Sequence, residues 1–147
     1  MWGPISRRPK LGPADWPAYG RKLTAFAERM AGFGVRMAFH HHMGTIVETD
    51  AEVDLLMQHT GRAAGMLYDT GHSAFSGGDP VALAKSQLKR IVHVHCKDAR
   101  RAVSDKARHG DMSFMDAVMA DIFIVPGDGC IDHDTILKAL ADDGYTG

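Results

Sequence analysis

Three short apolar runs, separated by segments with helical spacing, are the feature of this 147-residue chain that most constrains its fold. The runs are 35–39, 66–68 and 91–96, and the last is the richest in β-branched residues. Strands that alternate with helices form parallel βαβ units, because each connection has to cross back over the sheet. The alternation therefore predicts an α/β fold with a parallel sheet. It leaves two arrangements of that sheet open, a doubly wound sheet and a barrel.

Local signals give the limits of the helices. Thr49 with Glu52 is a capping-box pattern, and Asp79 followed by Pro80 is typical of a helix start. Residues 1–13 are rich in Pro, Gly and Arg and are expected to be irregular, and the run 122–125 is too short to assign. The expected helices span about 16–31, 49–59 and 79–89, and two more begin near 113 and 132.

The composition is that of a single globular domain, residues 1–147. With 45% hydrophobic residues and a net charge of −1, the chain is too apolar and too weakly charged to be disordered. The same weak charge argues against binding to nucleic acid or to an anionic membrane. No apolar run approaches the roughly 20 residues that cross a bilayer, and the N-terminus lacks a secretory apolar core. Two cysteines form no disulfide framework, so a cytoplasmic location is expected.

Histidine and acidic side chains follow each expected strand. In parallel α/β proteins of either arrangement, functional sites lie at the carboxyl ends of the strands, so these side chains should meet at one place. Imidazole nitrogen and carboxylate oxygen together form a donor set for a divalent metal. The sequence therefore predicts a metal site at this edge. The three segments are His40-His41-His42, Asp69-Thr-Gly-His72 and His93-Val-His95-Cys-Lys97-Asp98.

The third strand presents its polar residues on one face. His93, His95 and Lys97 share that face, while apolar residues and Cys96 share the other. A parallel strand buried on both faces is nearly all apolar, so this face suggests the polar mouth of a barrel. For His93, a core histidine bonded to a backbone carbonyl is an equal alternative, whereas for His95 the functional interpretation is favoured. Cys96 is expected to be a buried apolar group.

Asp69 taken alone would be a turn or cap aspartate, but the neighbouring histidines favour a metal role. His72 stays open between substrate contact, metal contact and simple exposure. Of the three consecutive histidines, at most His40 and His42 face the site together, because neighbours in an extended segment point to opposite faces. His41 is expected to pack elsewhere.

These motifs resemble the inosose dehydratases, a family within the xylose-isomerase-like sugar epimerase and isomerase superfamily of TIM barrels. The resemblance covers essentially residues 12–147. It implies a partial (β/α)8 barrel, truncated at both ends: the C-terminal half without the last strand. The matching segments are His40-His-His-Met-Gly-Thr45, Asp69-Thr-Gly-His72, His93-Val-His-Cys-Lys-Asp98 and Val125-Pro-Gly-Asp-Gly-Cys-Ile-Asp132.

The resemblance also implies a ligand set for a divalent metal, Mn²⁺ or Co²⁺. Asp69 and His95 match two superfamily ligands. A third ligand falls in the segment 40–48, where His42 is the first candidate and Glu48 the alternative. A fourth ligand, a Glu of the last strand, is absent from this chain. The substrate-binding positions that the resemblance implies are His40, His72 and Lys97.

By the same resemblance, the expected activity is that of a hydro-lyase of myo-inositol catabolism. It would remove water from 2-keto-myo-inositol (scyllo-inosose), a small polyol ketone, through a metal-stabilised enediolate. His72 and Lys97 are the candidates for acid and base. The isolated 147-residue chain is expected to have weak or no activity.

Three other interpretations of the sequence are possible. A keto-sugar isomerase or epimerase of the same superfamily would use the same metal without loss of water. A non-catalytic truncated fragment would expose unpaired strand edges, which favour association into a homo-oligomer. A nucleotide-binding doubly wound domain fits poorly, because no glycine-rich loop follows any strand.

Overall fold

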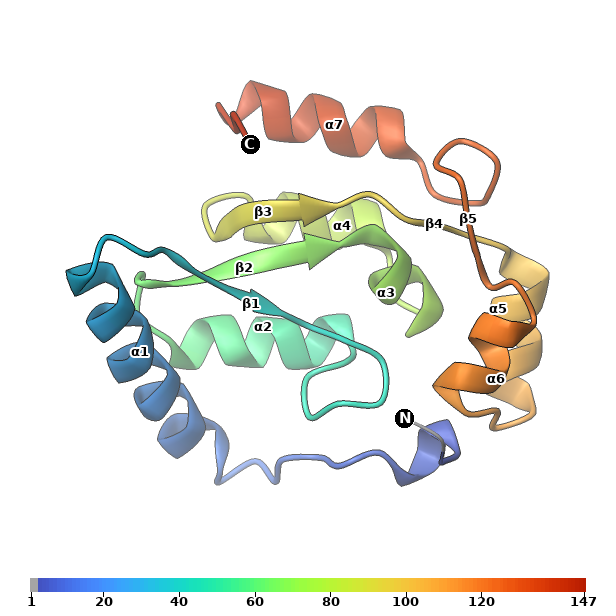
Figure 1. The fold of residues 1–147 in the computed structure, drawn as a ribbon, viewed down its shortest axis with the longest axis horizontal. Coiled ribbons are helices and arrows are strands. Elements are labelled where there is room, and N and C mark those ends of the chain that lie inside the picture. The colour runs from blue at the N-terminus through green and yellow to red at the C-terminus, as the bar shows by residue number, and fades with distance from the viewer. Residues whose placement is uncertain (1–2) are drawn as a thin grey trace.

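Three parallel strands form the sheet in the computed structural model, which describes residues 3–147 (Figure 1). They are β1 (Met37–His40), β2 (Ala64–Asp69) and β3 (Ile91–His95), in the order β1-β2-β3. Both neighbouring pairs are parallel, and their carboxyl ends point to the same side of the molecule. The predicted parallel α/β fold is therefore confirmed. The sheet does not close on itself.

The helices between the strands begin where the sequence signals placed them. Thr49 and Glu52 form both hydrogen bonds of a capping box, and Asp79 accepts from the first amides of the next helix. Asp132 likewise caps the last helix through the Thr135 amide. The helices are α1 (Trp16–Gly32), α2 (Asp50–His59), α4 (Pro80–Gln87) and α7 (His133–Asp142).

A second group of elements lies beyond the carboxyl ends of the strands. Two of these helices were not predicted from the sequence: α3, which follows β2 without a linker, and α5, whose exposed residues are mostly charged. The unassigned run 122–125 contains a short strand, paired antiparallel with a partner next to Lys97. The elements are α3 (Thr70–Phe75), β4 (Asp98–Ala99), α5 (Arg101–His109), α6 (Phe114–Met119) and β5 (Phe123–Ile124).

The N-terminal segment, predicted to be irregular over 1–13, contains one short 3-10 helix, η1 (Ile5–Arg7). Residues 1–2 of that prediction lie outside the described residues. Pro4 bridges Ser113, and Ser6 bonds Asp111 through its amide and its hydroxyl. The segment is thereby attached to the turn before α6.

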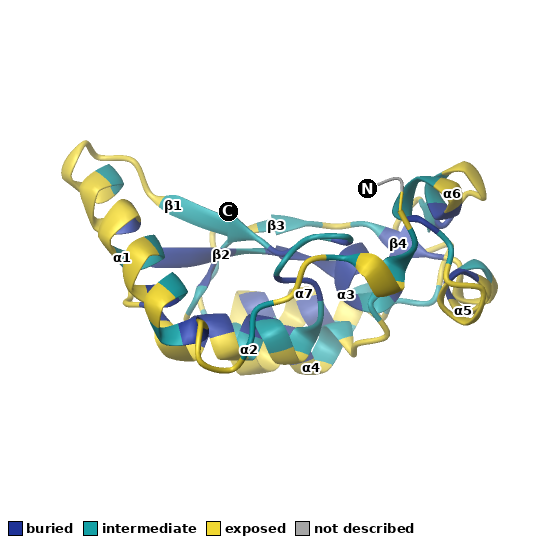
Figure 2. Cartoon of the chain, turned by 90° about the horizontal axis from the view of Figure 1, so that it is seen from below, coloured by how far each residue is buried: buried dark blue, intermediate teal, exposed yellow. Residues whose placement is uncertain are grey.

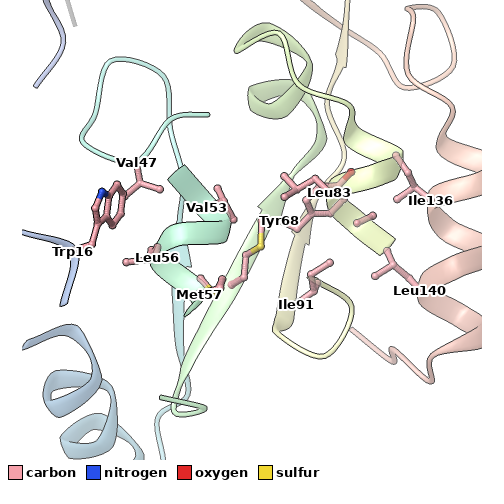
Figure 3. Close-up of a cluster of buried hydrophobic side chains, with 12 residues drawn as sticks. Trp16, Val47, Val53, Leu56, Met57, Tyr68, Leu83, Ile91, Ile136 and Leu140 are labelled. Atoms are coloured by element: carbon pink, nitrogen blue, oxygen red, sulfur yellow. The ribbon is translucent and has the colours of Figure 1, made fainter. Parts of the chain in front are cut away.

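The main core lies between one face of the sheet and the helices that cover it (Figure 3). Met66 and Tyr68 are two residues apart on β2, so both point to that face, and both are almost fully buried. The Tyr68 hydroxyl donates a 2.6 Å hydrogen bond to the carbonyl of Pro80 at the start of α4. Leu56, Leu83, Ile136 and Leu140 complete the core from α2, α4 and α7.

The opposite face of the sheet is open. In Figure 2, α2 and α4 lie on one side of the strands, and no element of residues 3–147 covers the other side. This face carries His40, Leu67, Asp69, His93 and His95, which the strand register places side by side. In a closed barrel the same face would be the interior. None of the described helices is long and apolar enough to cross a membrane.

Candidate metal centre

Asp69, the last residue of β2, lies at the centre of the site. It pairs in register with His95 on β3, and its side chain is fully buried. One carboxylate oxygen, Oδ1, accepts the His72 amide at 3.1 Å and caps α3. Asp69 therefore does cap a helix, which was the alternative to a metal role. The cap uses Oδ1 and leaves the other oxygen, Oδ2, facing the site.

Three nitrogen atoms, one from the end of β1 and two from the segment around the end of β3, surround Oδ2 of Asp69. His40 Nε2 lies 3.3 Å away and His95 Nδ1 lies 3.4 Å away. The Lys97 ammonium forms an ion pair with the same oxygen. Asp69 and His95 thus converge as predicted, and His40 joins them from β1.

His40, Asp69 and His72 form a group whose donor atoms lie within 4.8 Å of one another. The His72 Nε2 atom is 3.9 Å from Oδ2 of Asp69, and the other ring nitrogen is buried without a hydrogen-bond partner among the described residues. Two imidazoles and a carboxylate suit Zn²⁺, Mn²⁺ or Co²⁺. The residues present therefore fit a divalent metal ion.

The electrostatics of this group favour a charged Asp69 carboxylate beside a neutral His72 ring. Burial alone would raise the pKa of Asp69, but the His40 hydrogen bond and nearby His72 and Lys97 hold it below its ordinary value. Burial lowers the pKa of His72 to about 2, although Asp69 opposes the shift. A neutral imidazole keeps a lone pair free, which is the form that binds a metal.

His41 and His42 point in different directions, as predicted. The His41 ring is almost fully buried, its Nε2 accepts the Asp69 amide at 3.4 Å, and burial lowers its pKa to about 4. The His42 ring lies against the His72 ring, with centroids 3.9 Å apart. Its Nδ1 is 2.9 Å from the Met43 carbonyl and must donate there, which leaves Nε2 free. Its predicted role as a ligand stays a prediction.

Glu48, the alternative ligand, is engaged elsewhere. Its carboxylate accepts the Gly44 amide at 2.7 Å and pairs with Arg8 Nε at 3.4 Å. Arg8 also pairs with Glu52 at 2.7 Å and donates to the Thr45 carbonyl. These contacts join the N-terminal segment to the loop after β1, so Glu48 is the less suitable of the two candidates.

Contacts with Thr70, Gly71 and Phe123 position Lys97. The Thr70 hydroxyl accepts the Lys97 amide at 2.9 Å and donates to its carbonyl. The Lys97 ammonium lies 5.6 Å from the ring centre of Phe123, within the range of a cation–π contact. A side chain at Gly71 would collide with Lys97 and Phe123, so glycine is needed there.

Two aromatic rings form a wall beside the histidines. Phe114 of α6 lies 5.0 Å from the ring of His42 and 5.8 Å from that of His72, measured between ring centres. Phe123 of β5 lies 5.5 Å from the ring of His72. Both residues are remote in sequence from the strand ends, and no local motif marked them.

Asp98, which follows Lys97 in the third motif, organises a loop. It is fully buried, and its carboxylate accepts four backbone amides at 2.8 to 3.0 Å, those of Ala99, Gly127, Gly129 and Ile131. Burial opposes ionisation, but these bonds hold the pKa of Asp98 below its ordinary value.

The solvent exposure of His93 and Cys96 decides whether each of them is buried, as the sequence led us to consider. His93 is exposed on the open face, and its ring stands edge-on to that of His95 at 5.4 Å. Within residues 3–147 it is thus not a buried core histidine. The expectation that Cys96 is buried was wrong, because its side chain is exposed directly after β3 ends.

A family model described as xylose isomerase-like TIM barrel matches residues 3–147. Rhizopine catabolism protein MocC of Rhizobium meliloti is 66% identical over 98% of this chain and 44% of its own length. Inosose dehydratases of Bacillus thuringiensis and Geobacillus thermodenitrificans are 45% and 40% identical, over 97% of this chain and 48% of theirs. The chain thus spans about half the length of these relatives.

Solved structures resemble the chain in fold. The probable 3-DHS dehydratase AsbF of Bacillus anthracis, involved in petrobactin synthesis, superposes with a TM-score of 0.68 at 15% identity, over 98% of this chain and 52% of that one. The IOLI protein, solved with a zinc atom, gives 0.63 at 20% identity, over 90% and 45%. In each case about half of a barrel matches, so the predicted partial TIM barrel is confirmed.

Proposed function

Since the chain belongs to the xylose isomerase-like TIM barrel family, we propose that the complete protein is a metal-dependent hydro-lyase that removes water from inosose. The observation that carries the proposal is the convergence of His40, His95 and Lys97 on one oxygen of Asp69. Identities of 40 to 45% with inosose dehydratases over 97% of the chain support the substrate. The solved structures support the fold alone.

Asp69, His40 and His95 are the residues that we propose to hold the ion. His42 is a further candidate, and so is His72, which belongs to the group of donor atoms within 4.8 Å of one another. The ring nitrogens of His40 and His95 lie nearest to Oδ2. The donor chemistry suits Mn²⁺, Co²⁺ or Zn²⁺, and the IOLI protein was solved with zinc. A divalent cation bound there would act as a Lewis acid on the ketone of the substrate.

Lys97 and His72 are our candidates for the two proton transfers. Loss of water removes a proton beside the ketone and a hydroxyl group from the next carbon. The Lys97 ammonium, held at Asp69 and beside Phe123, would protonate the departing hydroxyl oxygen. His72, whose Nε2 lies 3.9 Å from Oδ2 of Asp69, is the candidate acceptor of the proton from carbon. Each transfer of this kind is worth roughly 10²–10⁴-fold in rate.

A second candidate substrate class comes from the 66% identity with a rhizopine catabolism protein. That identity is higher than the identity with the inosose dehydratases. The proposed site residues would serve a rhizopine-derived substrate equally, so substrate identity has to be tested directly.

The test uses a barrel-length chimera, in which this chain replaces the matching segment of the Geobacillus inosose dehydratase. We expect the chimera to convert inosose to the dione in the presence of Mn²⁺ or Co²⁺, and its Asp69→Asn variant to be inactive. A folded, metal-binding chimera that acts on rhizopine-derived compounds but not on inosose would favour the second candidate. Ketose isomerisation without loss of water would overturn the dehydratase proposal. We expect the isolated chain to be weakly active or inactive.

The ligand assignment has its own test, metal affinity measured by calorimetry. His95→Gln should weaken Mn²⁺ binding more than His72→Gln does. The opposite order would move His72 into the ligand set and His95 out of it.

A further inference from the structure

A separate cavity lies between α5 and the turn that joins α3 to α4. Its volume is about 190 Å³, which is room for several water-sized groups, since water in the liquid occupies about 30 Å³. None of the residues around Oδ2 of Asp69 lines it. It is therefore distinct from the candidate metal centre.

One face of α5 supplies the cations of this cavity. Arg101, Ser104 and Arg108 are three and then four residues apart, so they share a helix face, and all three line the cavity. Neither arginine forms an ion pair within the part of the chain that the structure describes. The two guanidinium groups are thus free to bind an anion.

The opposite wall brings backbone close to one of these arginines. Gly77, in the turn after α3, has a φ of +85° and lines the cavity. A Cβ atom at Gly77 would collide with the guanidinium of Arg108. Glycine therefore provides both the left-handed conformation and the space for Arg108.

Ser104 adds a hydroxyl group between the two arginines. The residue is only 5% exposed and lines the cavity. The α5 N-terminus also lacks a side-chain cap. A serine hydroxyl at this position can donate a hydrogen bond to an anion in the cavity.

Three acidic groups lie in or next to the cavity lining: Asp50, Asp79 and Asp105. Asp50 accepts from Ser73 and from the Asp79 amide, and Asp79 caps α4, so both carboxylates are occupied. Asp105 lines the cavity between the two arginines on α5 without pairing with either. It is the group that would oppose an anion.

We propose that this cavity binds a phosphate group, either free or as a monoester. Guanidinium groups match phosphate oxygens in shape and charge, and a serine hydroxyl donates to the same kind of acceptor. The proposal is independent of the reaction at Asp69 and of its substrate.

The test is calorimetric titration of the purified protein with inorganic phosphate and, in a second arm, with glycerol 3-phosphate. We expect saturable binding that Arg108→Gln and Arg101→Gln each weaken by roughly 10-fold, as for a lost charged hydrogen bond. Asp105→Asn should strengthen binding. Arg29→Gln, an exposed position on α1, is the matched control and should leave it unchanged.

Tighter binding of glycerol 3-phosphate than of inorganic phosphate would identify a monoester as the ligand, and the reverse would identify the free ion. Circular dichroism of each variant separates loss of binding from loss of fold. The proposal is overturned if no saturation occurs, if Arg108→Gln binds like the parent, or if Arg29→Gln loses as much affinity as Arg108→Gln.

Discussion

Asp69 performs a different task with each of its two carboxylate oxygens. Oδ1 caps α3 through the His72 amide, while Oδ2 faces His40, His95 and Lys97. The cap fixes the direction of the carboxylate, and burial excludes water from it. A cap position and a ligand position are therefore compatible in one residue.

Asp69→Asn should separate these two tasks. The amide oxygen can still cap α3, but the amide nitrogen that replaces Oδ2 cannot bind a cation. Affinity for Mn²⁺ should fall by at least about 100-fold, because losing a direct ligand costs more than the roughly 10–100-fold typical of its supporting residues. Calorimetry checks this, with the exposed Glu28→Gln as control. Equal affinity in both variants would contradict the proposed ligand.

The buried carboxyl group of Asp50 should make the stability of the protein depend on pH. Burial raises its pKa from 3.8 to about 6, although Ser73 and the Asp79 amide donate to it. The folded state then binds more protons than the unfolded state between these values, so this group's contribution to stability falls as pH rises from about 4 to about 6. Over that pH window, the free energy of unfolding of the unsubstituted protein should decline by up to about 3 kcal/mol relative to that of Asp50→Asn. Urea unfolding at a series of pH values measures it, and a constant difference would refute the assignment.

At the scale of the elements, Asp98 holds the loop between β5 and α7. Four backbone amides, three of them from residues 127–131, point at its carboxylate. The loop has few apolar side chains, and without the Asp98 carboxylate these backbone amides would lack an acceptor. A single buried charge therefore joins the end of β3 to the start of the last helix.

Replacing this anchor should be costly. Asp98→Ala leaves several amides without an acceptor and should lower the free energy of unfolding by about 3 kcal/mol or more. Asp128→Asn, exposed in the same loop, should change it by less than about 0.5 kcal/mol. Urea denaturation of the two variants provides the comparison. Similar stabilities would show that the loop does not depend on the Asp98 carboxylate.

At the scale of the whole molecule, the two faces of the sheet differ in what covers them. Met66 and Tyr68 are buried in the main core, whereas Leu67 between them is only half-buried on the open face. In a barrel-length protein the open face would be interior. Exposed strand edges also favour association, so formation of a homo-oligomer remains a proposal.

Adjacent substitutions in β2 test this difference. Met66→Ala should destabilise the chain by about 2–4 kcal/mol, and Leu67→Ala by less than about 1 kcal/mol. In the barrel-length chimera the cost of Leu67→Ala should rise, because its face becomes enclosed. Thermal or urea unfolding of both proteins measures the two costs. A large cost for Leu67→Ala in the isolated chain would mean that something already covers this face.

Much of the fold follows from local signals. The capping box at Thr49, the Asp79-Pro80 start and the β-branched run before His95 each lie within a few residues, and each appears where it was expected. The meeting of Asp69 with His95 also follows, because parallel strands align their carboxyl ends. The short helix α3 was missed because Thr70-Gly71 has the composition of a turn.

The sequence by itself determined the parallel α/β order and the strand ends that carry the candidate ligands, since helical spacing, caps and alternation act over a few residues. Only the tertiary structure decided which donors meet. His40 approaches Asp69, while Glu48 is held by Arg8, a residue 40 positions earlier. Such contacts depend on how distant segments pack, and no local pattern encodes that geometry.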